Sequence, residues 1–211
     1  MMVRTKKSGK IVEVFGCFDG KVVDEREHLT IIFSPAFLPI KWSNSSLTAD
    51  FLAKYFEDFF PSLKEVERGR TTLTRDEVRD AINYIANELI ENAVKFHYNP
   101  ELEIIFTLQL DPTCLTFVAT NSVNPKTMDQ FTAFITEVTS YDPGELLIQH
   151  LEIAAEVASN ESGIGFLTIM SDYGAKIGWK FETTQLKGAA DKINVTTMVQ
   201  LPIIKETFDG E

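Results

Sequence analysis

The sequence predicts an α+β protein: a two-layer sandwich with a single mixed or antiparallel β-sheet covered on one face by helices. A long helical pattern is followed by a pair of strand patterns, then by more helical patterns, and two strand patterns end the chain. This order lacks the regular alternation of strands and helices that parallel sheets need. Of the 211 residues, 44% are hydrophobic and 16 are Phe, enough to fill the core of a folded protein.

The first 45 residues are predicted to form an N-terminal strand extension. Residues 1–10 are basic and polar, and we expect them to be frayed. Residues 11–23 predict two short strands around Asp19-Gly20, a dipeptide typical of hairpin turns. Residues 29–33 are a β-branched run, expected either to add an edge strand or to pair with a second subunit.

Two helices are predicted next. Residues 49–60 have helical apolar spacing, and Pro61 ends the pattern. Residues 72–98 give the strongest helical pattern, with a cap and an acidic first turn between Thr74 and Glu77. The apolar residues of this pattern follow one another at steps of three or four: Val78, Ile82, Ile85, Leu89, Ala93 and Phe96.

The rest of the chain completes the domain predicted over residues 46–203, followed by a tail at 204–211. Residues 101–110 and 114–120 predict a hairpin, and 121–125 predict a turn. A helical lid insert spans 122–160, expected to cover a ligand, to form a dimer or partner surface, or simply to pack on the domain. Its two helical patterns cover 126–139 and 144–158, with Pro143 as a start signal, and a short glycine-led helix and strands at 176–183 and 193–202 follow.

The charge balance excludes several classes of function. The chain has 20 Lys and Arg against 31 Asp and Glu, a net charge of −11. This balance argues against a general nucleic-acid binder and against docking on an anionic membrane. We expect no membrane span and no secretory signal, because no apolar run is long enough and the N-terminus lacks an apolar core. Cys17 and Cys114 are too few for a disulfide framework, so a cytoplasmic location is expected.

The helix at 72–98 carries the most informative polar residues. At about 100° per residue, Glu88, Asn92 and Lys95 share one narrow stripe at the border of the apolar face. A carboxylate can take a proton, an amide oxygen suits magnesium, and an ammonium group can face phosphate oxygens. The same pattern also fits an ordinary amphipathic helix.

Two glycines, Gly163 and Gly165, precede the apolar start of the short helix. Bare glycine backbone lets N–H groups approach a phosphate, and the helix dipole favours the anion. A glycine pair before a helix also fits a simple tight turn.

Taken together, these features resemble the GHKL superfamily of ATP-binding proteins, which includes gyrase B and the sensor histidine kinases. The family's N-box has a Glu followed four residues later by an Asn, as Glu88 and Asn92 are here. A glycine-led helix and two final strands follow in the family's order, over residues 45 to 203. The sequence departs from the family at its Asp-x-Gly-x-Gly box, where Asn121-Ser122-Val123-Asn124-Pro125 stands and both glycines are absent.

The resemblance implies ATP and magnesium as cofactors and assigns roles to matching positions. Glu88 would be the catalytic base and Asn92 the magnesium ligand. Lys95 would lie near the phosphates, and Asn121 would replace the Asp that reads adenine. The remaining positions implied are Gly163 and Gly165 at the phosphates and a threonine beside the adenine. Thr196 or Thr197 matches this threonine position, and Thr197 is assigned to it.

Among family members of this size, the chain most resembles the stand-alone anti-sigma-factor serine kinases of bacteria. That resemblance implies a protein partner: a STAS-domain antagonist that is phosphorylated on Ser or Thr, a sigma factor or another response regulator. A homodimer is an open possibility. The alternative hypothesis is a non-catalytic interaction module that keeps the fold, has lost or weakened nucleotide binding, and uses the helical insert to bind proteins. A third is a generic α+β domain in which the N-box match is coincidental.

Overall fold

A computed structural model describes residues 2–7, 9–20, 27–34, 45–62, 72–157, 163–185 and 191–204. Its strands form one seven-stranded sheet in the order β1-β2-β6-β7-β5-β4-β3, and every neighbouring pair is antiparallel. The predicted α+β class with one sheet is therefore confirmed. The strands are β1 (Met2–Lys7), β2 (Lys10–Gly16), β3 (Glu27–Phe33), β4 (Ile104–Leu110), β5 (Cys114–Val123), β6 (Lys176–Thr184) and β7 (Lys192–Pro202).

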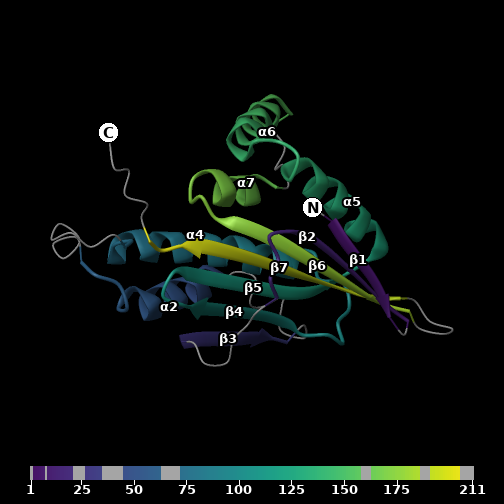
Figure 1. Cartoon of the computed structure of the whole chain (residues 1–211), viewed down its shortest axis with the longest axis horizontal. Helices are drawn as coiled ribbons and strands as arrows, with labels where there is room; N and C mark the ends of the chain where they lie inside the picture. Colours follow the sequence, from purple (N-terminus) through teal and green to yellow (C-terminus); the bar gives the residue numbers. More distant parts are fainter. Residues whose placement is uncertain are drawn as a thin grey trace.

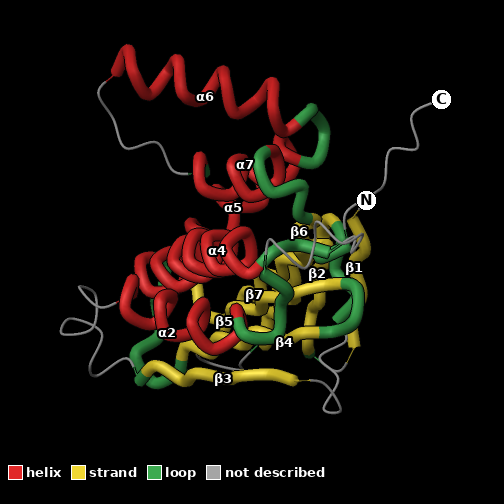
Figure 2. The backbone as a smooth tube through the Cα atoms, turned by 90° about the vertical axis from the view of Figure 1, so that its left-hand side faces the viewer, coloured by secondary structure: helices red, strands yellow, loops and turns green. Residues whose placement is uncertain are grey.

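The helices gather on one side of this sheet, as Figures 1 and 2 show. The long helix α4 lies along the sheet beside α2, while α5 and α7 lie above α4 and α6 is outermost (Figure 2). None of the described helices is long and apolar enough to cross a membrane. The helices are α2 (Ser45–Glu57), α4 (Arg75–Lys95), α5 (Pro125–Val138), α6 (Pro143–Val157) and α7 (Ile164–Ser171).

The core lies between α4 and the central strands. The apolar stripe predicted for the long helix is buried, with the exception of Phe96, which forms the half-buried C-cap of α4. Opposite this stripe, the inward-facing side chains of the strands are large and fully buried. They include Phe106, Leu108, Phe117, Trp179 and Phe181. The sheet thus fixes the position and rotation of α4, which in turn sets where its polar border residues lie.

The N-terminus of α4 is fixed by its cap. The Thr74 hydroxyl accepts from the backbone N–H of Glu77, and the Glu77 carboxylate accepts from the Thr74 backbone in return. This is the reciprocal capping box that the sequence predicts between these two residues.

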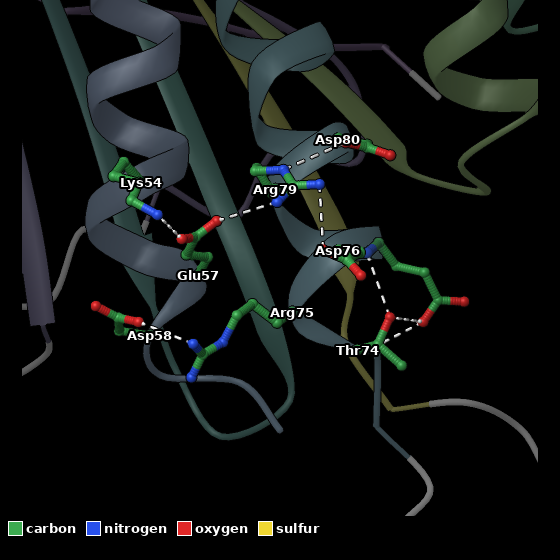
Figure 3. Close-up of polar contacts among 9 residues, drawn as sticks. Lys54, Glu57, Asp58, Thr74, Arg75, Asp76, Arg79 and Asp80 are labelled. Atoms are coloured by element: carbon green, nitrogen blue, oxygen red, sulfur yellow. Dashed lines mark hydrogen bonds and ion pairs between the residues drawn. The ribbon is translucent and has the colours of Figure 1, made fainter. Parts of the chain in front are cut away.

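Ion pairs attach the end of α2 to the start of α4 (Figure 3). The buried Glu57 carboxylate accepts from Lys54 and lies 3.7 Å from the Arg79 guanidinium. The hydrogen bond from Lys54 is the main reason why the pKa of Glu57 is lowered. The positive charges of Arg79 and Arg75 lower it further. Arg79 also pairs with Asp76 at 3.1 Å, so this guanidinium lies between the two helices.

The structure corrects the prediction for the first residues. Residues 2–7 are not frayed but form β1, which pairs with β2 across a turn at Gly9, where φ is +77°. The predicted hairpin around Asp19-Gly20 is absent from the described residues, because 17–20 lie outside strands and 21–26 are not described. An edge strand with two exposed faces needs no apolar alternation, which explains why β1 carried no strand signal. Residues 29–33 do form an edge strand, within β3.

The predicted turn at 121–125 is also wrong. Strand β5 continues to Val123, which pairs with Ile193 of β7. Asn124 is then the N-cap of α5, where its side-chain oxygen accepts from the Thr127 backbone N–H at 2.8 Å, and Pro125 is the first helical residue. Asn and Pro are turn formers in isolation, but they are also favoured at the N-cap and first position of a helix.

Candidate functional site

A cavity of about 380 Å³ lies between α4, α5, the central strands β5 and β7, and the start of α7. Its floor is formed by the inward-facing residues of β5 and β7, and its sides by the two helices. The lining residues are Leu89, Asn92, Ala93, Lys95 and Phe96 of α4 and its C-cap, Ala119, Asn121 and Val123 of β5, Thr127, Gln130, Phe131 and Phe134 of α5, Gly163 and Phe166 at α7, and Val195 and Thr197 of β7.

Five of the seven residues selected from the sequence line this cavity. They are Asn92, Lys95, Asn121, Gly163 and Thr197, and they come from four separate parts of the chain. The fold therefore brings together polar groups that are up to about a hundred residues apart in the sequence. A pocket of this kind, largely apolar with a few convergent polar groups, is typical of small-molecule and cofactor sites.

The other two selected residues, Glu88 and Gly165, lie just outside the cavity lining and touch each other. A methyl group added at Gly165 would overlap the Glu88 carboxylate, so only glycine allows this approach. Burial raises the pKa of Glu88, and the negative charge of Glu91 raises it further. Glu88 is thus a partly desolvated carboxylate held at the first turn of α7.

The surroundings of Glu88 on α4 include an aromatic pair. Tyr84, one helical turn earlier, stacks on Tyr173, with 5.4 Å between the ring centroids. Burial raises the pKa of both phenols, and the charge of Asp172 contributes at each of them. The charge of Glu88 also raises the pKa of Tyr84, which is consistent with their separation by one helical turn.

The start of α7 is also covered by the chain itself. Gly163 has a φ of +116°, a conformation that side chains with a Cβ rarely adopt. A methyl group at Gly163 would overlap the Phe134 ring of α5. Both glycines of the predicted phosphate-binding turn are thus in close contact with other side chains, Phe134 at one and Glu88 at the other.

The strand residues of the site point in defined directions. The Asn121 side chain is 6% exposed, and its amide nitrogen donates to the Ser122 carbonyl oxygen at 3.1 Å. The amide oxygen is the remaining acceptor of that side chain. On β7, Thr197 lines the cavity, whereas the Thr196 hydroxyl bonds to that of Thr120 at 3.0 Å. The structure therefore favours Thr197 over Thr196 as the site threonine.

The sequence predicts a helical lid that includes α5, but it does not identify the residues of α5 that form a wall of the cavity. Phe131 of α5 stacks on Phe166 of α7 at 5.9 Å and meets the edge of Trp179 of β6 at 6.2 Å. The apolar periodicity of residues 126–139 marks a packed face, but it does not say what that face packs against. A helix that begins directly where β5 ends is the signal that could have placed it over the sheet.

Some residues of the cavity fit the magnesium ion and the phosphates that the resemblance implies. The Asn92 carboxamide is a ligand type that magnesium uses when nucleotide phosphates complete its coordination. Lys95 is exposed, and its amine lies 5.2 Å from the centroid of the Phe96 ring at the edge of the cavity. Across the described residues, no group of three or more His, Cys, Asp and Glu side chains lies at metal-binding spacing.

The histidines nearest to these elements have structural contacts. His97 follows α4, and its Nδ1 lies 3.4 Å from the Ser122 hydroxyl. Burial lowers the pKa of His97, which keeps the ring neutral. His150 of α6 lies 3.7 Å from the Glu137 carboxylate of α5 and so connects the two insert helices.

Comparisons of the sequence with protein-family models and with curated proteins found no match. The resemblance to the GHKL superfamily therefore rests on the quoted motifs and on their order along the chain. The structure shows an antiparallel sheet with helices on one side and five of the seven predicted residues lining one cavity.

Proposed function

We propose that this protein binds Mg-ATP in the cavity between α4, α5 and the sheet, and that it acts as a signalling regulator resembling anti-sigma-factor serine/threonine kinases. One observation carries the proposal. Five of the seven residues that the sequence motifs predict for the site come from four separate parts of the chain and line one cavity: Asn92, Lys95, Asn121, Gly163 and Thr197.

The polar residues of the cavity divide into two groups by burial. Asn121 and Thr197 are buried on the floor, where an amide oxygen and a hydroxyl suit the polar edge of a base between apolar walls. On α4, Asn92 is half-buried and Lys95 is exposed, and their carboxamide oxygen and ammonium group suit magnesium and phosphates. This polarity matches a nucleotide bound with its base inward.

Glu88 is the proposed general base. Bound Mg-ATP would supply the phosphoryl group. As the hydroxyl oxygen of a Ser or Thr acceptor bonds to the γ-phosphorus, the bond to the ADP oxygen breaks, and the Glu88 carboxylate accepts the hydroxyl proton. The raised pKa of Glu88 makes its carboxylate a stronger base than an exposed one. Its position one helical turn before Asn92 places the base beside the proposed magnesium ligand.

The proposed partner is a protein with a basic binding surface. The net charge of −11 favours association with such a surface and disfavours acidic ones. A STAS-domain antagonist, a sigma factor or another response regulator would fit this role.

Replacing Glu88 with Gln tests the assignment of the base. Glu88→Gln keeps the size of the side chain and removes the proton acceptor, so we expect nucleotide binding to remain and phosphoryl transfer or ATP hydrolysis to fall by a factor of a hundred or more (roughly the contribution of a general base). Glu101→Gln, at an exposed carboxylate before β4 that does not line the cavity, is the matched control and should keep its activity. Full activity in Glu88→Gln would contradict the assignment.

A second candidate function is a non-catalytic interaction module with lost or weakened nucleotide binding. Two observations favour it: the family's glycine box is replaced by residues 121–125, and Phe134 and Glu88 cover the two glycines at α7. The absence of any heat on titrating the folded protein with ATP would favour this module over the kinase.

A further inference from the structure

We infer that helix α5 provides the base-recognition wall of the cavity, with Gln130 and Thr127 as its polar contacts to a purine base. The inference rests on the proposed function, since it concerns how a nucleotide would be held in the same cavity. Neither residue was selected as a site residue from the sequence, and both line the cavity.

The position of α5 is fixed at its start and at its middle. At the start, Asn124 caps the helix directly after β5, and Pro125 occupies the first helical position. Further along, Phe131 packs in an aromatic cluster with Phe166 and Trp179. The helix that follows β5 is therefore a rigid wall of the cavity at the place where the family's glycine box would stand.

One face of α5 is turned to the cavity. The four lining residues are Thr127, Gln130, Phe131 and Phe134, and their spacing of three, one and three residues is that of a single helical face. Phe131 and Phe134 supply aromatic surface on which a base can stack, an interaction that any of the bases can make. Thr127 and Gln130 supply the polar groups on the same face.

The polar groups of this face are available for a ligand. Within the part of the chain that the structure describes, neither the Gln130 amide nor the Thr127 hydroxyl makes a hydrogen bond to the protein; the Thr127 backbone N–H donates to Asn124. Asn121 differs, because its amide nitrogen already donates to Ser122.

A carboxamide offers a donor and an acceptor side by side, which matches the adjacent acceptor and amino group on the edge of adenine. Gln130 therefore offers both a donor and an acceptor, whereas one N–H of Asn121 already donates to the protein backbone.

Calorimetric titration with adenosine and with Mg-ATP tests the inference. Gln130→Leu replaces the amide with an apolar group that cannot donate or accept, so we expect both ligands to bind about tenfold more weakly. Gln149→Leu is the matched control. Gln149 is exposed on α6 and does not line the cavity, so its replacement should leave both affinities unchanged. Thr127→Val should weaken binding of both ligands by a smaller factor.

Asn92→Ala separates this inference from the proposed function. Asn92 is assigned to magnesium, so its loss should weaken Mg-ATP and leave adenosine unchanged, whereas Gln130→Leu should weaken both. If the wild-type protein binds Mg-ATP through Asn92 but Gln130→Leu binds both ligands with unchanged affinity, the inference about α5 is overturned and the proposed function stands. Wild-type protein that binds neither ligand would overturn the proposed function and the inference with it.

Discussion

The Glu88 carboxylate lies directly against the backbone of Gly165, at a separation that excludes a methyl group on that residue. This contact joins the middle of α4 to the first turn of α7. It places an acidic group where the positive end of a helix dipole would otherwise face the cavity. The contact thus connects the proposed base with the glycine turn proposed to hold phosphate, and it can be tested directly.

Gly165→Ala measures this contact. The new methyl group must displace the Glu88 side chain, so we expect catalytic activity to fall while the protein stays folded. In a Glu88→Ala background the obstacle is gone, and Gly165→Ala should stabilise the protein by about 0.5–1 kcal/mol through its higher helix propensity. Urea unfolding of the four proteins of this double-mutant cycle gives the coupling. Equal effects of Gly165→Ala in both backgrounds would mean that the two residues do not touch.

Gly163→Ala measures the packing of α5 on the start of α7. The substitution forces a Cβ onto a backbone with φ +116° and against the Phe134 ring. Gly174 is the matched control, because it also has a positive φ, of +60°, but open space where a Cβ would stand. Gly174→Ala should cost about 1 kcal/mol, and Gly163→Ala about 1–3 kcal/mol more. Chemical unfolding checks this difference, and equal costs would argue against the contact with Phe134.

Glu88→Gln should change the pH dependence of stability. Burial raises the folded-state pKa of Glu88, so the folded protein binds this proton more tightly than the unfolded chain does. The charged carboxylate therefore destabilises the fold above the folded-state pKa. This penalty declines as the pH falls below the folded-state pKa and is gone below the unfolded value of about 4.3. We expect Glu88→Gln to be more stable than wild type at about pH 7, with a difference that shrinks toward pH 4.

Unfolding curves across this pH range test the assignment. Glu101→Gln, at an exposed carboxylate before β4, is the control. Its free energy of unfolding should differ from that of the wild type by the same amount at each pH. If the difference for Glu88→Gln stays constant with pH, then burial does not raise the pKa of this group.

Thr74→Ala should destabilise the protein by about 1 kcal/mol, because it removes the hydroxyl that accepts from the Glu77 backbone in the capping box. Thr136→Ala, at an exposed position inside α5, is the control and should be neutral or slightly stabilising. Urea unfolding distinguishes the two. A neutral Thr74→Ala would show that the cap contributes little to the stability of α4.

The sequence predicts best where one residue pattern has one structural solution. The steps between Val78 and Ala93 fix a helix face, and Thr74 with Glu77 fixes its start, because both signals are local. Strand β1 could not be predicted, since its exposed residues need no apolar alternation and its pairing with β2 depends on a turn at Gly9.

The sequence predicts the site residues on α4, β5 and β7 but not those on α5. Asn92 and Lys95 follow from helical geometry and the resemblance, and Asn121 and Thr197 from the order of the elements. Gln130 could not be found in this way, because its role depends on α5 lying over the sheet rather than away from it. That arrangement results from aromatic packing between residues distant in the sequence, such as Phe131 and Trp179.

We propose that this cavity binds Mg-ATP through Asn92. Calorimetric titration of the protein with ATP, in the presence and absence of magnesium, decides whether it does. We predict magnesium-dependent binding by the wild-type protein, loss of that dependence in Asn92→Ala, and unchanged binding in Asn83→Ala, which alters the same helix outside the cavity. A folded wild-type protein that releases no heat with ATP, or an Asn92→Ala variant that binds Mg-ATP as the wild type does, would contradict the account.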